Sequence, residues 1–133
     1  MSAAGQHDEA PDGGAVELLA AGLGPRARGC FTTRGAGAPP VSAQDPYAGL
    51  NLALHVGDDA ARVGRARRRL EEALGLGPGR RAGAGPRPPG LAWMNQIHSA
   101  VVATAQAGEV PTADALVLDS RTGGAPAGCC VLV

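Results

Sequence analysis

Lysine is absent from this chain, and aromatic side chains are nearly so, with one Phe, one Tyr and one Trp among 133 residues. The 12 basic residues are therefore all arginine, and 12 acidic residues balance them to a formal net charge of zero. A neutral chain has no overall field that draws it onto nucleic acid or an anionic membrane, and this one has few rings on which bases can stack. We expect neither nucleic acid nor a membrane among its partners.

Long apolar runs are also missing. No stretch of about 18 apolar residues occurs, so the sequence predicts no transmembrane helix. The first residues carry acid rather than the basic start of a signal peptide. The three cysteines, two of them adjacent, do not make a disulfide framework. Together these absences predict a cytoplasmic protein.

Glycine and proline are abundant, at 21 and 11 residues. Hydrophobic residues still make up 44% of the chain, and with so few aromatics the core must consist of Leu, Val and Ala. The length suits one domain or part of one. Residues 1–14 are polar and Gly-rich, so we expect a disordered leader there and the folded part at 15–133.

The clearest predicted element is a helix that begins after Asp58 or Asp59, because either carboxylate can cap the first-turn N–H groups. Gly75 and Gly77 are expected to end the helix. Its buried face is predicted to consist of residues at helical spacing, namely Val63, Ala66, Leu70, Ala73 and Leu74.

Several short strands are expected around this helix. Residues 49–56 alternate between leucine or valine and other side chains, which predicts a half-buried strand with Asn51 and His55 on its other face. These two side chains then either point into one cleft or face solvent. Residues 15–20 favour a strand or a helical turn, and further strands are predicted at 27–34, 91–97, 101–104, 115–119 and 129–133.

His98 is the leading candidate for chemistry. It follows Asn95 and Gln96 at a predicted turn, where a neutral imidazole can bind a metal and a neighbouring amide can orient a substrate. The alternative is a hydrogen-bonded histidine at a strand end. Arg34 can bind a phosphate or carboxylate through its planar fork, or be a surface charge. Cys129 and Cys130 can offer thiolates to zinc, or act as small apolar strand residues.

Five blocks occur in one order along residues 15–119, and together they carry a resemblance. They are Phe31-Thr-Thr-Arg34, Pro46 to Asp59, Val63 to Leu70, Trp93-Met-Asn-Gln-Ile-His98 and Thr112-Ala-Asp-Ala-Leu-Val117. The order resembles the YfiH-like family, also called the laccase-domain, multicopper polyphenol oxidoreductase or peptidoglycan-editing-factor family. The resemblance implies an α/β (α+β) fold that forms part of an α/β/β/α sandwich.

The same resemblance implies a function. It points to a purine nucleoside phosphorylase that uses phosphate and a purine nucleoside (adenosine, inosine or methylthioadenosine), and that also deaminates adenosine. The implied metal is zinc, with His98 at the first ligand position. Copper fits less well. A blue-copper site alone needs two His and one Cys, and a multicopper cluster needs many more ligands, whereas this chain has three His in all and one of them, His7, lies in the expected leader. Arg34 is the candidate phosphate partner, with Asn51, His55 and Gln96 as candidate substrate-binding residues.

Departures from the family pattern leave two alternatives. The resemblance also implies a cysteine ligand and a second histidine ligand. The cysteine is either Cys129 or Cys130, or residues 129–133 are the strand that precedes it and the cysteine itself is missing. The block with the second histidine ligand would follow Val133, and Ser99 replaces the usual glycine. One ligand cannot hold zinc tightly. The resemblance therefore implies that residues 15–133 are the N-terminal part of a single YfiH-like domain, truncated at its C-terminus. On one alternative the chain is a phosphorylase-type enzyme whose incomplete site leaves it inactive alone. On the other it is a catalytically dead remnant or a partner chain whose site is completed in trans.

Overall fold

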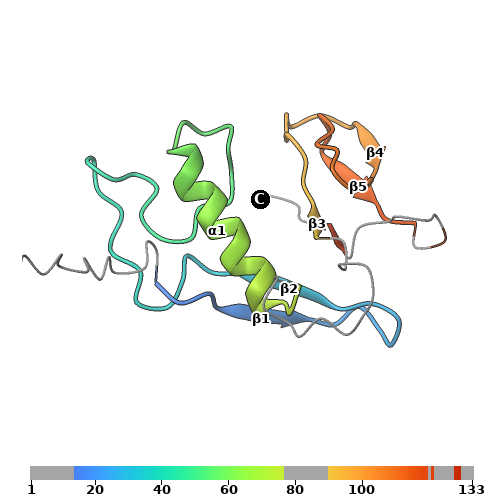
Figure 1. Cartoon of the computed structure of the whole chain (residues 1–133), viewed down its shortest axis with the longest axis horizontal. Helices are drawn as coiled ribbons and strands as arrows, with labels where there is room; N and C mark the ends of the chain where they lie inside the picture. Colours follow the sequence, from blue (N-terminus) through green and yellow to red (C-terminus); the bar gives the residue numbers. More distant parts are fainter. Residues whose placement is uncertain (1–13, 77–89, 120, 122–127, 130–133) are drawn as a thin grey trace, which may run out of the picture. The chain divides into compact units, whose positions relative to one another are not determined.

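The computed structural model describes residues 14–76, 90–119, 121 and 128–129 (Figure 1). The predicted mixed α and β class is confirmed, whereas the four-layer sandwich remains a prediction. The predicted leader lies outside the described residues except for Gly14. No described helix is long and apolar enough to cross a membrane. In chain order the elements are β1 (Leu18–Ala21), β2 (Gly29–Thr32), α1 (Ala60–Ala73), β3 (Leu91–Ala92), β4 (Val102–Thr104), β5 (Ala115–Val117) and β6 (Gly128–Cys129).

The chain divides into two compact units, residues 1–51 and 52–133, which are described separately. The first unit contains β1 and β2, which pair as an antiparallel hairpin with Leu19 opposite Phe31. Its strands confirm the expectations for 15–20 and 27–34. Beyond β2 the hairpin is extended by a bridge between Ala15 and Ala36, which exchange hydrogen bonds of 3.0 and 2.9 Å.

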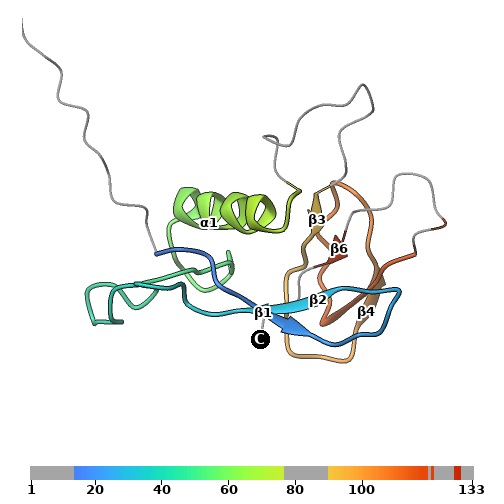
Figure 2. The same ribbon diagram turned by 90° about the horizontal axis from the view of Figure 1, so that it is seen from below.

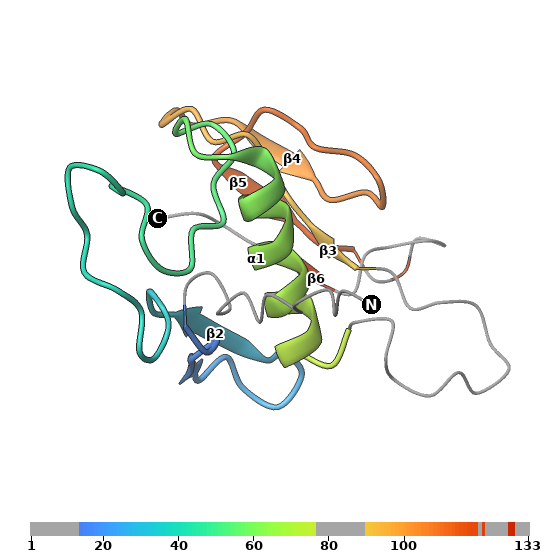
Figure 3. The same ribbon diagram turned by 60° about the vertical axis from the view of Figure 1, so that its left-hand side comes forward.

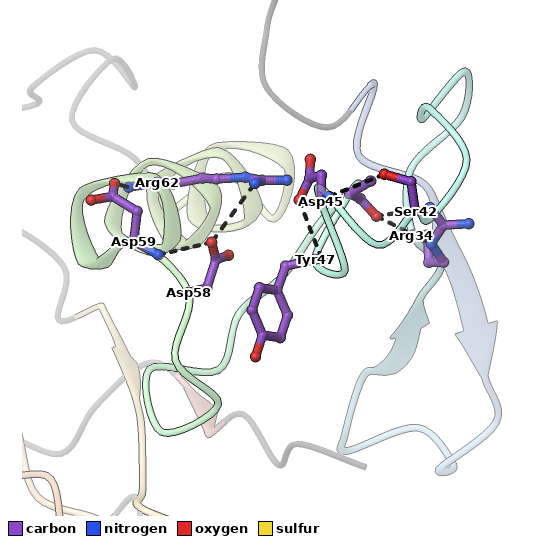
Figure 4. Close-up of polar contacts among 8 residues, drawn as sticks. Arg34, Ser42, Asp45, Tyr47, Asp58, Asp59 and Arg62 are labelled. Atoms are coloured by element: carbon purple, nitrogen blue, oxygen red, sulfur yellow. Dashed lines mark hydrogen bonds and ion pairs between the residues drawn. The ribbon is translucent and has the colours of Figure 1, made fainter.

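Helix α1 opens the second unit and begins as predicted. The Asp59 carboxylate accepts a hydrogen bond of 2.7 Å from the Arg62 N–H, which satisfies one of the unpaired first-turn donors (Figure 4). At the other end Gly75 has a φ of +76° and the Leu76 N–H donates to the Glu71 carbonyl, which is the Schellman arrangement. Of the predicted apolar face, Val63, Ala66 and Leu70 are buried, Leu74 is half-buried and Ala73 is exposed.

Helix α1 and β3 can be followed in Figure 3, and side chains of the helix contact residues of the segment 91–95. The Arg67 guanidinium lies 4.0 Å from the centre of the Trp93 ring, a cation–π contact, and its Nε donates to the Leu52 carbonyl at 2.9 Å. The Glu71 carboxylate accepts the Leu91 N–H at 3.1 Å. These contacts tie α1 to β3, and β3 pairs in parallel with β6 (Figure 2).

The core of the second unit is small and lies on this segment. Val63 and Met94 are its largest fully enclosed side chains, at 0% and 1% exposure, and Trp93 is 8% exposed. The other buried apolar residues of this unit are leucines and alanines, namely Leu52, Ala66, Leu70, Ala92, Ala105 and Ala113. The expected Leu, Val and Ala core is therefore present, but Met94 and Trp93 are buried with it.

The predicted strand at 49–56 is wrong. Residues 49–59 form loop and turn, with Leu52 buried but Leu54 and Val56 exposed at 45% and 38%. Gly49 has a φ of +103°, which breaks an extended run at its first residue. The alternation of leucines therefore does not produce a sheet face, and the argument that a strand directs Asn51 and His55 into one cleft no longer applies.

The predicted strands from 91 onward exist but are shorter. β3 covers two residues, after which Asn95 forms an isolated parallel bridge with Thr112. β4 and β5 pair in parallel with Val102 opposite Ala115. Of the predicted strand at 129–133, only Cys129 lies within the described residues, in β6.

Candidate functional site

His98 lies in an exposed bend that joins the segment 91–95 to β4, which confirms the predicted turn. Its φ is +57°, and among the described non-glycine residues it alone has a positive φ. The left-handed region costs an L residue roughly 1–2 kcal/mol, so surrounding contacts must hold His98 there.

Those contacts come from the Asp114 carboxylate. Its Oδ1 accepts the N–H groups of Ile97 at 3.1 Å and His98 at 2.6 Å. Its Oδ2 accepts the N–H of Ser99 at 2.7 Å and the Ser99 hydroxyl at 2.5 Å. Three consecutive backbone donors thus converge on one carboxylate, an arrangement that forms a small anion-binding concavity.

The Ser99 hydroxyl extends this network. While it donates to Asp114 it also accepts the Val101 N–H at 3.2 Å, so the two ends of the bend are linked. The Ser99 hydroxyl is the main cause that lowers the pKa of Asp114 below its usual 3.8, with the N–H groups of Ser99, His98 and Ile97 acting in the same direction. The carboxylate is therefore ionised at neutral pH and remains a pure acceptor.

One segment, 111–117, supports both sides of the His98 bend. Before the bend, the Asn95 N–H donates to the Pro111 carbonyl at 2.9 Å and the Asn95 carbonyl accepts the Ala113 N–H at 3.1 Å. After the bend, the Val101 carbonyl accepts the Asp114 N–H at 2.9 Å. β4 and β5 then continue the same pairing. The backbone of Asp114 is therefore fixed between the two arms of the bend that its side chain holds.

Arg34, in the first unit, has a different environment from the one expected of a phosphate-binding fork. Its Nε and Nη2 donate to the Ala48 carbonyl at 3.2 and 2.8 Å, and Nη2 also donates to the Pro39 carbonyl at 2.7 Å (Figure 4). The fork thus closes the loop 35–48 by binding its main-chain carbonyls. These bonds leave Nη1 as the group with which Arg34 could meet a phosphate.

The remaining predicted site residues lie on loops. Asn51 is half-buried, and its N–H donates to the Gly49 carbonyl at 3.1 Å. His55 is exposed in a turn, and Gln96 is half-buried just before the His98 bend. Gln96 and His98 are therefore brought onto one bend. Cys130 lies outside the described residues.

The donor set of the described residues does not fit a complete zinc site. Within residues 14–76, 90–119, 121 and 128–129, no three His, Cys, Asp or Glu side chains gather into a group that could hold a metal ion. Zinc in proteins takes three or four protein ligands. Asp114, the carboxylate nearest to His98 in the network, already uses both oxygens on the bend, so we derive no chemical step through a metal.

Asp114 is the residue that sequence reasoning missed. The block Thr112 to Val117 contributes to the resemblance, yet the carboxylate within it was given no role. Its partners are backbone N–H groups 15 to 17 residues away, and nothing in the sequence marks them.

About two thirds of this chain is similar in sequence to known proteins. A purine nucleoside phosphorylase of Corynebacterium glutamicum is 38% identical over 99 residues, which cover 71% of this chain and 35% of the relative. Those of Pseudomonas aeruginosa and Streptomyces griseus are 37% and 40% identical; each match covers 68% of this chain, and 30% and 33% of the relative. The chain spans about a third of the length of these relatives.

A crystal structure of a Neisseria meningitidis protein of the family DUF152 is similar at 30% identity and a TM-score of 0.49, over 73% of this chain and 35% of that one. The family described as multi-copper polyphenol oxidoreductase laccase matches residues 28–131, which include the Arg34 loop, helix α1, the His98 bend and Asp114. This chain belongs to the multi-copper polyphenol oxidoreductase laccase family.

Proposed function

We propose that this chain supplies the His98-bearing part of a purine nucleoside phosphorylase site, and that it needs further ligands to turn over substrate. The observation that carries the proposal is the exposed His98 bend, fixed by Asp114, in a chain whose relatives are named purine nucleoside phosphorylases. The substrates would be phosphate and a purine nucleoside such as inosine, adenosine or methylthioadenosine. Exposed free Cys30 suits a reducing compartment such as the cytoplasm.

Phosphorolysis breaks the bond between the base and C1′ of the sugar while a phosphate oxygen forms a new bond to C1′. The protein must hold the phosphate and stabilise the positive charge that develops on the sugar. In this proposal Arg34 contributes Nη1 to the phosphate, Asn51, His55 and Gln96 position the nucleoside, and His98 is a zinc ligand. Adenosine deamination would be a second activity of the completed site.

The donor set of the described residues supports the proposal that the site is incomplete. His98 is one ligand, and the described residues bring no second and third donor to it. Even with a thiolate from Cys130, two ligands would fall short of the three that catalytic zinc uses. The complement would be the part of a relative that lies outside its match to this chain.

The test is an assay of hypoxanthine release from inosine and phosphate, with metal analysis of the same samples. The 133-residue chain is assayed alone, then mixed with the remaining part of the Streptomyces griseus relative. We expect no turnover and no stoichiometric zinc alone, and both in the mixture.

Matched variants assign the residues. His98→Ala should abolish zinc and turnover in the mixture, whereas His7→Ala should change neither. Turnover by the chain alone, with stoichiometric zinc, would contradict the proposal that the site is incomplete. Failure of the mixture to bind zinc or react would favour the alternative, a catalytically dead remnant.

A further inference from the structure

We propose that Asp114 is a positioning residue that sets the direction of the His98 side chain by holding its backbone in the left-handed conformation. The importance of this positioning for catalysis rests on the function proposed above, whereas the positioning itself rests on the geometry of the bend. Asp114 acts through His98 and the proposal gives it no contact with substrate or metal.

The first step is the convergence of donors. Ile97, His98 and Ser99 point three successive N–H groups at one carboxylate, over distances from 2.6 to 3.1 Å. Successive N–H groups can converge on one anion only when the backbone between them turns, and at His98 it turns through a φ of +57°. The three hydrogen bonds to the Asp114 carboxylate therefore require the positive φ of His98, and they stabilise it in turn.

The second step is the rigidity of the anchor. Asp114 follows Ala113, which has no exposed surface, and precedes β5. The N–H groups of Asp114 and Ala115 both donate to the Val101 carbonyl, at 2.9 and 3.3 Å. Because its backbone is hydrogen-bonded, the Asp114 carboxylate starts from a fixed position, as residues that support functional groups must do.

The third step separates positioning from general stability. The bend is at the surface: Ile97 is 51% exposed, and His98 and Ser99 are exposed as well. Little apolar surface is buried by ordering it, so its hydrogen bonds contribute mainly to the conformation of the bend. Loss of the carboxylate should release His98 while α1 and the core around Met94 stay folded.

The test uses the isotope-labelled 133-residue chain in solution, where NMR reports on each amide. In Asp114→Ala we expect hydrogen exchange of the amides of residues 97–99 to rise by roughly tenfold, because charge-assisted hydrogen bonds are lost. The His98 Cα and Cβ shifts should move toward random-coil values, because its backbone is no longer held at positive φ. Amides of α1 should exchange as in the parent chain.

Asp114→Asn gives a sharper, residue-by-residue expectation. The asparagine keeps an oxygen at the Oδ1 position, so the amides of Ile97 and His98 should stay protected. The group at the Oδ2 position becomes a donor, so the Ser99 amide should lose its protection. This variant also decides the matter if Asp114→Ala fails to fold. Asp119→Asn removes a carboxylate two residues after the end of β5 and should leave His98 unchanged.

Unchanged His98 shifts and exchange within twofold of the parent in Asp114→Ala would overturn the proposal, as would uniform protection of all three amides in Asp114→Asn. A different result bears on the proposed function alone. If the reconstituted mixture reacts equally well with His98→Ala, the catalytic role of His98 fails, yet the NMR result still decides whether Asp114 positions it.

Discussion

Replacing Met94 with alanine should destabilise the second unit strongly. Met94 is 1% exposed and lies on the segment that leads to the His98 bend. Truncation of such a residue removes its buried methylene and methyl groups and leaves a cavity, which costs about 2–5 kcal/mol. Since the core is small and its neighbours can partly relax, we expect a loss of about 3 kcal/mol in the free energy of unfolding.

Urea unfolding followed by tryptophan fluorescence measures this change cleanly. Trp93 is the chain's one tryptophan and is itself buried, so its signal reports on the second unit. With a slope of about 1.5 kcal/mol/M, a loss of about 3 kcal/mol lowers the midpoint by about 2 M. Met94→Leu conserves volume and should cost less than about 1.5 kcal/mol, which keeps the test informative if the alanine variant does not fold.

Val110→Ala is the control in the same unit, because Val110 is 51% exposed and its truncation should change stability by no more than about 0.5 kcal/mol. If Met94→Ala lowered the free energy of unfolding by less than about 1 kcal/mol, the reasoning would be refuted, because truncation of a well-packed methionine to alanine costs about 2–5 kcal/mol.

Three further predictions concern local structure. Asp59→Ala should lower the free energy of unfolding of the second unit by about 1 kcal/mol by removing the N-cap, whereas Asp59→Asn should restore most of it, as measured by urea unfolding followed by circular dichroism. Gly49→Ala should destabilise the first unit far more than Gly37→Ala: both have positive φ, but a Cβ on Gly49 would lie 2.6 Å from the Arg34 carbonyl oxygen, and one on Gly37 meets nothing within 4 Å. The temperature at which the amide NMR signals of the first unit disappear compares the stability of the two variants. Equal losses of stability would contradict the close approach between a Cβ on residue 49 and the Arg34 carbonyl oxygen. The Arg121 guanidinium lowers the pKa of Asp119 below 3.8, so this carboxylate's stabilisation is present above pH 3.8 and lost as the pH falls through its depressed value; Arg121→Gln should raise the pKa toward 3.8 in a carboxyl NMR titration, and an unmoved midpoint would disprove the link.

The sequence predicted well wherever local rules decide the structure. The Asp59 cap, the apolar face of α1 and the glycine at its end are signals of one helix and need no distant partner. The same holds for β2, where Phe31 and Thr32 favour a strand, and for its pairing with β1, which is close in sequence. Residues 15–20 alone left a strand and a helical turn open. The position of the His98 turn was also found, because small and polar residues follow the apolar run.

Distant contacts decided what the sequence did not reveal. The leucine alternation at 49–56 resembles a strand, but Leu50 donates its N–H to the Arg34 carbonyl and Leu52 offers its carbonyl to Arg67, so the backbone is used by partners outside any sheet. Likewise nothing in the sequence indicates that Nε and Nη2 of Arg34 bind the main-chain carbonyls of Ala48 and Pro39, whereas its role toward phosphate stays a prediction. Asp114 was missed because its partners are the N–H groups of the His98 bend, and backbone donors leave no mark in a sequence.

The use of backbone donors at the His98 bend has a consequence for how this sequence can vary over evolution. Every amino acid except proline carries an N–H, so the three backbone bonds to Asp114 do not depend on which side chains stand at residues 97 and 99. A residue without a hydroxyl at position 99 would lose only the two further bonds, to Asp114 and from the Val101 N–H. Proline at 97, 98 or 99 would remove one of the N–H donors to Asp114, so this substitution is expected to disrupt the bend.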